Sequence, residues 1–369
     1  MKTIAAVSKA PREPFVVEEV DLPEPGPTDV LVRIVGVGVC HTDLASRDGL
    51  LGAPFPAIFG HEGAGIVERV GAGVTKLKPG DHVVLAPASD GTCLSCQHGA
   101  PMYCDAFNAL NFQTDPSGPN AALADGGSAR LGYFGQSSFA AYALACERNA
   151  VKVPDDIDLH LLGPLGCGIQ TGAGTVMNGL RPAAGASIVV LGTGAVGLAA
   201  LMAAVICGCA SIIAVDRVAA RLDLARSLGA THGIDTSKGG DLGEAIRVIL
   251  PRGADFVVDS AGVQALIGQS VAGLAHRGTL ALVAVPPASD QNLELPWLPM
   301  LLAGQRAQGF VEGDSVPDEF IPRMIELYRQ GRFPFDRLIR SYEFAEINQA
   351  MEDLHHGTTI KAVLRVTEA

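Results

Sequence analysis

Charged and aromatic residues are both scarce in this sequence of 369 residues. Aspartate, glutamate, lysine and arginine make up 18% of it, aromatic residues make up 5%, and tryptophan occurs once. With 48% hydrophobic residues, the chain has the composition of a globular protein rather than a disordered one. Positive charge is the scarcer sign, since 27 lysines and arginines stand against 39 aspartates and glutamates, for a formal net charge of −12. That balance opposes binding to nucleic acid or to an anionic membrane, so we expect neither partner.

We expect neither a signal peptide nor a membrane-spanning helix. The chain starts Met1-Lys2-Thr3 and continues into a short alternating segment, so we expect no signal peptide and a cytoplasmic location. Residues 188–215 are apolar enough to suggest a membrane span, but their early glycines and the strand patterns at both ends favour a buried β-α-β unit. In a cytoplasmic chain the eight cysteines indicate metal ligation or burial before disulfides.

What the sequence does contain is a glycine-rich turn that follows a β-branched run and leads through an apolar helix to an acidic residue. The pattern G-x-G-x-x-G is formed by Gly192, Gly194 and Gly197. The first glycine allows a sharp turn, the second lets the backbone approach a pyrophosphate, and the third packs helix against strand. The N-terminus of the helix presents N–H groups to phosphates. Asp216 can bind a ribose 2′-hydroxyl and repel a 2′-phosphate, so NAD is the expected coenzyme. The positive charge of Arg217 beside it is the one feature that leaves NADP as an alternative coenzyme.

Two kinds of pattern divide the chain. Up to about residue 158 it consists of short strand patterns broken by Gly and Pro, which is typical of a compact β-rich domain. Within it, residues 113–132 carry almost no apolar side chains and are predicted to be a surface excursion without regular structure. From 159 to 311 helix and strand patterns alternate, which predicts a parallel sheet covered by helices on both faces. Residues 312–369 are predicted to add two helices and a closing strand.

Three residues that can bind a metal stand in glycine-dense turns at the edges of apolar segments. They are Cys40 in GVGVCHTD, His61 in FGHEGAG and Cys167 in LGPLGCGIQTGAG. Two thiolates and one imidazole would leave the fourth position of a tetrahedral zinc open, as in catalytic zinc sites. Their spacing alone does not group them, and for each taken singly a buried core role is the commoner one.

Taken together, these motifs resemble the zinc-dependent alcohol dehydrogenases of the medium-chain dehydrogenase/reductase superfamily. The resemblance covers nearly the whole chain: G-H-E-x-x-G at Gly60–Gly65, the contexts of Cys40 and Cys167, a cysteine lobe and the glycine turn follow in the same order. Residues 133–139 and 162–174 are most similar to the benzyl and aryl-alcohol dehydrogenase branch.

The resemblance implies an α/β protein of two domains. Residues 1–158 would form a GroES-like β-rich catalytic domain with the zinc sites, and residues 159–311 a Rossmann domain with a doubly wound parallel sheet that binds NAD. Residues 312–369 would return to the catalytic domain.

The resemblance also assigns roles around the metal. It makes Cys40, His61 and Cys167 the ligands of a catalytic zinc. Glu62 becomes an acid that can approach the metal, and Thr42 the hydroxyl that takes the alcohol proton toward the nicotinamide ribose. Asp43 becomes the acceptor that orients His61, which has an independent reason, since a metal-bound imidazole needs its other N–H held.

Further contacts with the coenzyme follow from the same resemblance. Thr171 is the expected nicotinamide contact, Lys361 the basic residue on the pyrophosphate, and Val285 lies beside the coenzyme and the substrate. Ala45 occupies the position where many family members end their proton relay in a histidine. The relay would therefore end in water or use His41, whose alternative role is a purely electrostatic contact with phosphate.

A second cluster differs from the family pattern. The structural zinc lobe of the family has four cysteines. This sequence keeps the last three, as Cys93, Cys96 and Cys104, and has Asp90 at the position of the first. A carboxylate is an acceptable though harder zinc ligand, so we expect a second, closed zinc site. The alternative is a degenerate, empty lobe.

The implied reaction is the reversible, NAD-dependent and zinc-catalysed oxidation of a primary alcohol, aromatic, benzylic or allylic, to its aldehyde. Tyr133 and Phe134 are placed near the substrate, and Ala86 stands where family members often carry a bulky aromatic residue. We expect a homodimer or homotetramer. Two alternatives remain: a zinc-free reductase of the same superfamily that acts on enones or quinones, and a non-enzymatic NAD-binding protein.

Overall fold

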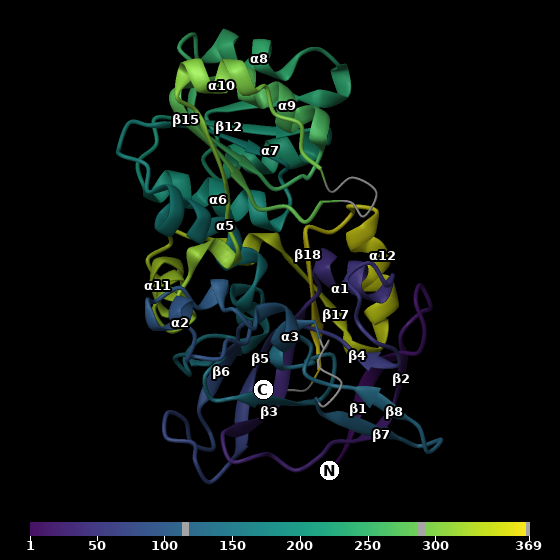
Figure 1. Cartoon of the computed structure of the whole chain (residues 1–369). Helices are drawn as coiled ribbons and strands as arrows, with labels where there is room; N and C mark the ends of the chain where they lie inside the picture. The colour runs from purple at the N-terminus through teal and green to yellow at the C-terminus, as the bar shows by residue number, and fades with distance from the viewer. Residues whose placement is uncertain (113–117, 287–291, 367–369) are drawn as a thin grey trace. The chain divides into compact units, whose positions relative to one another are not determined.

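The computed structural model describes residues 1–112, 118–286 and 292–366, and it divides into two compact units (Figure 1). Unit 1 consists of Met1–Cys167, Val316–Ile325 and Asp336–Ala369, and unit 2 of Gly168–Ser315 and Glu326–Phe335. Helix α11 (Pro317–Arg329) is shared between them.

Unit 1 is built on two sheets. The first is a small closed barrel with the strand order β1-β2-β7-β8-β4. Its strands are β1 (Lys2–Ser8), β2 (Val16–Asp21), β4 (Ala57–Ile58), β7 (Asn120–Leu123) and β8 (Ser128–Arg130). The second has seven strands in the order β10-β6-β5-β3-β18-β17, with β9 also paired to β3. Its strands are β3 (Asp29–Gly38), β5 (Glu62–Val70), β6 (His82–Leu85), β9 (Tyr142–Cys146), β10 (Ala150–Lys152), β17 (Ile339–Glu343) and β18 (Lys361–Arg365).

The central strand β3 organises the second sheet. It is ten residues long, mostly buried, and pairs antiparallel with β5, β9 and β18. Gly38 at its end lies opposite Glu62 at the start of β5 and opposite Val363 of β18. Three segments that are distant in the sequence therefore meet where β3 ends.

The helices of unit 1 are short. They are α1 (His41–Arg47), α2 (Leu94–Gln97), α3 (Phe107–Asn111), α4 (Leu159–Leu162) and α12 (Ile347–His355). Helix α1 begins directly after β3, and the N–H of its N-cap Cys40 donates to Asp43 Oδ2 at 2.9 Å.

Unit 2 is a six-stranded sheet in which every pairing is parallel, with the order β13-β12-β11-β14-β15-β16. Its strands are β11 (Ser187–Leu191), β12 (Ser211–Asp216), β13 (His232–Asp235), β14 (Ala254–Asp259), β15 (Leu274–Leu282) and β16 (Arg306–Gly309). The predicted parallel sheet is confirmed. The strand order reverses between β11 and β14, and ligands of such sheets bind at the carboxyl ends of the strands beside this reversal.

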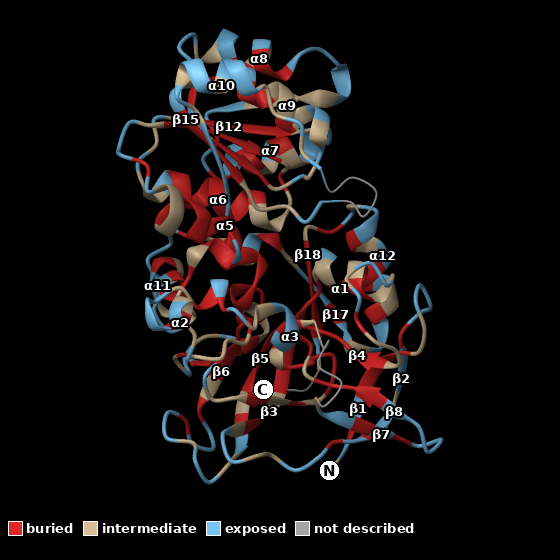
Figure 2. Cartoon of the chain, viewed as in Figure 1, coloured by how far each residue is buried: buried red, intermediate tan, exposed pale blue. Residues whose placement is uncertain are grey.

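Most helices of unit 2 connect successive strands, and the first of them precedes the sheet. They are α5 (Gly168–Gly174), α6 (Ala195–Ile206), α7 (Ala219–Ser227), α8 (Leu242–Ile249), α9 (Gln264–Ala272) and α10 (Trp297–Ala303). The apolar α6 is mostly buried, whereas α10 is largely exposed (Figure 2). In the described ranges, no helix has the length and apolar character that crossing a membrane requires.

Two expectations need correction. Of the stretch predicted to lack regular structure, residues 113–117 lie outside the described residues, but the remainder contains the antiparallel pair β7 and β8. Its small residues alternate between exposed and buried, with Ala121 and Leu123 facing inward, and this weak period of two was overlooked. Residues 159–167, predicted to open the second domain, lie with unit 1 because 163–166 pack against β5 and β6.

Candidate active site

Four side chains gather where β3 ends. Possible ligand atoms of Cys40, His61, Glu62 and Cys167 all lie within 4.8 Å of one another. Cys40 follows β3 and His61 precedes β5, so the pairing of Gly38 with Glu62 brings these two ligands to neighbouring strand ends. The structure thus groups residues that the sequence spacing did not.

Cys167 reaches the cluster because two glycines allow the segment before it to pack directly against the backbone of β5 and β6. A Cβ on Gly163 would lie 2.2 Å from the carbonyl oxygen of Glu62, and one on Gly166 would lie 2.1 Å from that of Leu85. No side chain fits at those distances, so glycine at both positions is required to deliver Cys167.

Asp43 supports the cluster through hydrogen bonds to its ligand residues. Its Oδ1 lies 2.9 Å from His61 Nδ1 and accepts the Gly60 N–H at 3.2 Å, while its Oδ2 accepts the N–H of Cys40. Asp43 and His61 are both fully buried. The carboxylate therefore holds one imidazole nitrogen and leaves Nε2 directed to the ligand set.

Neighbouring groups favour the thiolate of Cys40 and the protonated imidazole of His61, so a metal bound here would displace the imidazole proton. The hydrogen bond with Cys167 is the main cause that holds the pKa of Cys40 well below its usual range, and the charge of Lys361 acts in the same direction. Burial lowers the pKa of His61, but the charge and hydrogen bond of Asp43 outweigh it and hold the pKa well above its usual range.

The donor set fits zinc. His61 Nε2 is buried and has no hydrogen-bond partner among the described residues. An unpaired buried nitrogen costs stability unless something binds it. With the sulfurs of Cys40 and Cys167 it makes the three-ligand N/S set that leaves a position open in catalytic zinc sites. These three residues would hold the metal.

Glu62 is joined to the C-terminal strand. Lys361 Nζ lies 2.8 Å and 2.9 Å from the two carboxylate oxygens of Glu62 and donates to the Val39 carbonyl at 3.2 Å. Burial raises the pKa of Glu62 to about 7, although the Lys361 charge lowers it. Lys361 is 2% exposed and engaged here, so its contact with a pyrophosphate and the approach of Glu62 to the metal stay predictions.

Aromatic rings surround His61. Its ring stacks on Phe134 at 4.5 Å between centroids and meets the edge of Tyr133 at 5.6 Å. The Tyr133 hydroxyl bonds to Ser46 Oγ at 2.7 Å and donates to the Thr42 carbonyl at 3.2 Å. Both aromatic residues are buried. They pack against the ligand histidine and fix its position.

The remaining predicted residues of unit 1 lie nearby on different elements. Thr42 Oγ1 accepts a hydrogen bond from Cys40 Sγ at 3.6 Å. His41 is an exposed residue at the start of α1, and Ala45 on the same helix is half-buried. Ala86 is fully buried and donates its N–H to the Asn149 carbonyl.

Gln136 supports the cluster but was not predicted from the sequence. This side chain, 1% exposed, donates to the His61 carbonyl at 3.0 Å and accepts the Gly63 N–H at 3.1 Å, so it clamps the backbone that carries the ligand. The sequence feature that could have indicated its role is the polar run 136–138 between two phenylalanines. The rest of that segment has the composition of a buried core.

The second cluster lies in one short loop. Ligand atoms of Asp90, Cys93, Cys96 and Cys104 lie within 4.8 Å of one another. Asp90 Oδ1 accepts the N–H groups of Cys93 and Thr92, which hold the pKa of Asp90 below its usual range. Burial raises the pKa of Cys104 to about 11. Four converging donors without an open position fit a structural metal.

The glycine turn of unit 2 has the geometry that its sequence predicts. Gly192 has a φ of 86°, and a Cβ on Gly197 would lie 1.9 Å from the Gly192 carbonyl oxygen. Gly194 is the N-cap of α6, and a Cβ there would have nothing within 4 Å, so its backbone can be approached. These are the three glycine functions of a dinucleotide turn.

Asp216 at the end of β12 also supports this turn. Its Oδ2 accepts both the N–H and the hydroxyl of Thr193, at 2.8 Å and 2.6 Å, and its Oδ1 accepts the Val218 N–H at 3.0 Å. Arg217 beside it is exposed. Thr193 is a second residue that sequence analysis missed.

Two predicted coenzyme contacts lie elsewhere in unit 2. Thr171 on α5 is 9% exposed and donates to Glu312 Oε2 at 3.2 Å. Val285 follows β15 and is 58% exposed. Their contacts with a coenzyme stay predictions.

Comparison with known proteins defines the class. Residues 26–155 match the family model of the alcohol dehydrogenase GroES-like domain, and residues 195–330 match that of the zinc-binding dehydrogenases. The chain belongs to the zinc-dependent alcohol dehydrogenases of the medium-chain dehydrogenase/reductase superfamily, so the resemblance, the fold class and zinc as the family's metal are confirmed.

Individual relatives extend over the whole chain. A geraniol dehydrogenase from Castellaniella defragrans is 44% identical over 98% of this chain and 96% of its own. The crystal structure of a benzyl alcohol dehydrogenase from Acinetobacter calcoaceticus, 44% identical, superposes with a TM-score of 0.93 over 100% of both chains. An alcohol dehydrogenase zinc-binding domain protein from Burkholderia ambifaria, 47% identical, reaches 0.96 with the same coverage. Alcohol dehydrogenase activity is thus supported.

Proposed function

We propose that this chain is an NAD-dependent zinc enzyme that reversibly oxidises primary allylic and benzylic alcohols to aldehydes. The observation that carries the proposal is the convergence of Cys40, Cys167 and His61, whose buried Nε2 has no hydrogen-bond partner among the described residues. We also propose a cytoplasmic location, because five of the eight cysteines are candidate metal ligands rather than disulfide partners.

The residues around this set have distinct tasks. When bound, zinc lowers the pKa of an alcohol hydroxyl at its open position. Asp43 keeps the imidazole of His61 in one orientation, and Gln136 fixes the backbone on either side of it. Thr42, beside Cys40, is the hydroxyl that we assign to take the alcohol proton. The relay then ends in water or at His41.

The choice of NAD rests on Asp216. A carboxylate at the end of the second strand binds the 2′-hydroxyl of the adenosine ribose and repels a 2′-phosphate. The exposed Arg217 is the adjacent charge that could offset this repulsion.

The substrate class rests on two relatives and on the apolar character of the site. Geraniol and benzyl alcohol, named in those relatives, are primary alcohols whose hydroxyl-bearing carbon adjoins an unsaturated carbon. Tyr133 and Phe134 pack against His61, and Phe107 and Phe112 pack against Phe134. An apolar wall of this kind suits an unsaturated hydrocarbon group.

An activity panel with a metal count tests the proposal. We expect kcat/KM for geraniol and benzyl alcohol to exceed that for ethanol by roughly 100-fold, because apolar contacts add free energy with each buried carbon. NAD⁺ should be preferred over NADP⁺, and purified protein should carry two zinc ions per chain. A higher kcat/KM for ethanol would overturn the substrate class. Turnover of enones by zinc-free protein would support the alternative function, a zinc-free reductase.

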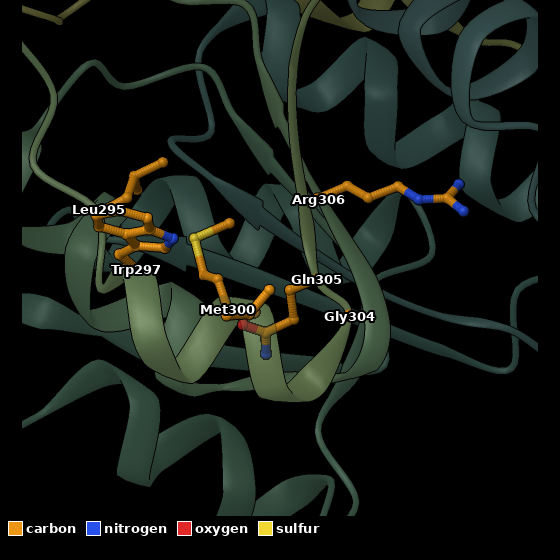
Figure 3. A pocket seen from close by; sticks show the side chains of 7 residues that line it. Leu295, Trp297, Met300, Gly304, Gln305 and Arg306 are labelled. Carbon is orange, nitrogen blue, oxygen red and sulfur yellow. The ribbon is translucent and has the colours of Figure 1, made fainter.

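We further propose that two copies associate through α10 and the edge strand β16. Trp297, Leu298, Leu301 and Leu302 of α10 are 62–83% exposed, and β16, which pairs with β15, ends the sheet. Figure 3 shows Leu295, Trp297 and Met300 gathered on one side, with Arg306 extending away. The segment WLPMLLA carries no charged residue, so two copies that meet there bring no like charges face to face within it. An unpaired edge strand can pair with its own copy about a two-fold axis.

Sedimentation tests this surface. Leu301→Glu should convert a dimer or tetramer to smaller species, whereas Val248→Glu, at an 83% exposed residue of α8, should not. Trp297 is the only tryptophan, so its emission should shift to longer wavelength on dissociation. A monomeric wild type, or unchanged assembly in Leu301→Glu, would exclude this interface.

A further inference from the structure

A buried carboxylate in unit 2 touches the predicted nicotinamide contact. Glu312 is 8% exposed, and its Oε2 accepts hydrogen bonds from Gln170 Nε2 at 3.1 Å and from Thr171 Oγ1 at 3.2 Å. An acceptor of two donors from the same helix, α5, is held firmly in place. Neither the glycine turn nor Asp216 accounts for this acid.

The backbone around Glu312 is strained. Glu312, Gly313 and Asp314 have φ values of 48°, 65° and 50°, a left-handed run that non-glycine residues rarely adopt. Such conformations persist where packing over-determines them, and they cluster at functional sites.

Close packing against α5 maintains this run. A Cβ on Gly313 would lie 2.5 Å from the Gln170 carbonyl oxygen and 2.8 Å from that of Thr171. Asn178 Nδ2 also donates to the Gly313 carbonyl at 3.3 Å. The turn thus keeps the Glu312 carboxylate beside the Thr171 hydroxyl.

The position of Glu312 in the sheet points to the same half of the coenzyme site. Asp216 ends β12 on one side of the strand-order reversal, and Glu312 follows the carboxyl end of β16 on the other. In doubly wound sheets the two halves of a dinucleotide lie on opposite sides of this reversal. Glu312 therefore lies in the half that faces away from the adenosine.

Another buried acid of this half is committed to its own turn. Asp259 at the end of β14 accepts the N–H groups of Ala261 and Gly262, both at 3.1 Å. Glu312 differs because its hydrogen bonds lead to a side-chain hydroxyl at the predicted ring site.

We propose that Glu312 determines the preference of this site between oxidised and reduced coenzyme. Its negative charge favours NAD⁺, whose nicotinamide ring is cationic, over NADH, whose ring is neutral. Because Glu312 Oε2 accepts the hydrogen bond of the Thr171 hydroxyl, the lone pairs of the hydroxyl oxygen are left to accept a carboxamide N–H. This inference rests on the proposed function, in which Thr171 contacts the nicotinamide.

Coenzyme titration tests the inference without turnover. In Glu312→Gln, which keeps the shape and removes the charge, the ratio of the Kd of NAD⁺ to that of NADH should rise roughly tenfold. Asp314→Asn, which removes a charge from the same turn, should leave the ratio unchanged. Glu312→Asp, which keeps the charge, should lie close to wild type and serves as the second variant if the glutamine protein does not fold.

The outcomes separate two failures. Equal weakening of both coenzymes in Glu312→Gln, or a shifted ratio in Glu312→Asp as large as in Glu312→Gln, would show a purely structural residue and overturn the inference. Wild-type protein that binds neither coenzyme would instead overturn the proposed function.

Discussion

The two cysteine clusters of unit 1 have similar ligand atoms but different supports. The cluster of Cys40, His61 and Cys167 is assembled from distant segments and held by the side chains of Asp43 and Gln136. The cluster of Asp90, Cys93, Cys96 and Cys104 lies within one loop and is held by that loop's own N–H groups. The first therefore depends on the whole core of unit 1, whereas the second depends on local chain geometry.

The largest effect should come from breaking the first cluster. Cys167→Ser should lower kcat/KM on the order of a thousandfold, because a catalytic metal supplies several kcal/mol of charge stabilisation. Metal analysis should show one zinc lost. Cys209→Ser, at a half-buried cysteine outside both clusters, should keep both zinc ions and activity. Full activity in Cys167→Ser would remove this cluster from catalysis.

The supporting side chain should matter less than the ligand. Asp43→Asn replaces an acceptor of three bonds by an amide that must turn its NH₂ toward a donor. We expect a 10–100-fold loss of zinc affinity, roughly the range found for such partners. Competition with a chelator measures it. Asp48→Asn, at the C-cap of α1, is the control, and equal affinities in the two variants would contradict the role of Asp43.

The loop cluster should release its metal first. Asp90 and Cys93 are only half-buried, and a carboxylate is a harder ligand than a thiolate. Two phases of zinc release to a chelator are therefore expected, and Asp90→Cys should slow the fast phase about tenfold. Asp105→Cys adds a cysteine outside the ligand set and should not. A single phase of release for both zinc ions would contradict the expected difference in stability between the two clusters.

The smallest effect should come from the aromatic frame. Tyr133→Phe removes the hydroxyl that bonds Ser46 and Thr42 and should lower the free energy of unfolding by about 1 kcal/mol. Urea denaturation measures it, with Tyr142→Phe on β9 as the control. Zinc content should stay the same. A loss of zinc in Tyr133→Phe would show that zinc binding depends on this hydroxyl as well.

Local patterns made much of this protein predictable. The glycine turn and the alternation of helix and strand are short-range signals, and the parallel sheet followed from them. The cluster around His61 was not accessible in that way, since its grouping depends on the register of β3 with β5 and on the close approach of Gly163 and Gly166. Only the resemblance to a family brought those ligands together.

The residues that were missed share one physical property. Gln136, Thr193 and Glu312 act through side-chain hydrogen bonds to segments distant in the sequence or to another turn. No periodicity or motif marks such residues, because their partners are defined only by the folded chain. Only Gln136 had a sequence signal, as the first of three polar residues in a segment that is otherwise apolar and aromatic.

The bonds of Asp216 limit how the coenzyme choice can be re-engineered. Three of the roughly four acceptor positions of its carboxylate are already used by Thr193 and Val218. A replacement intended to admit a 2′-phosphate would therefore also release the turn that contains Gly192 and Gly194. The same carboxylate thus sets both the coenzyme preference and the geometry of the loop. A redesign for NADP therefore has to replace Thr193 and Asp216 as a pair.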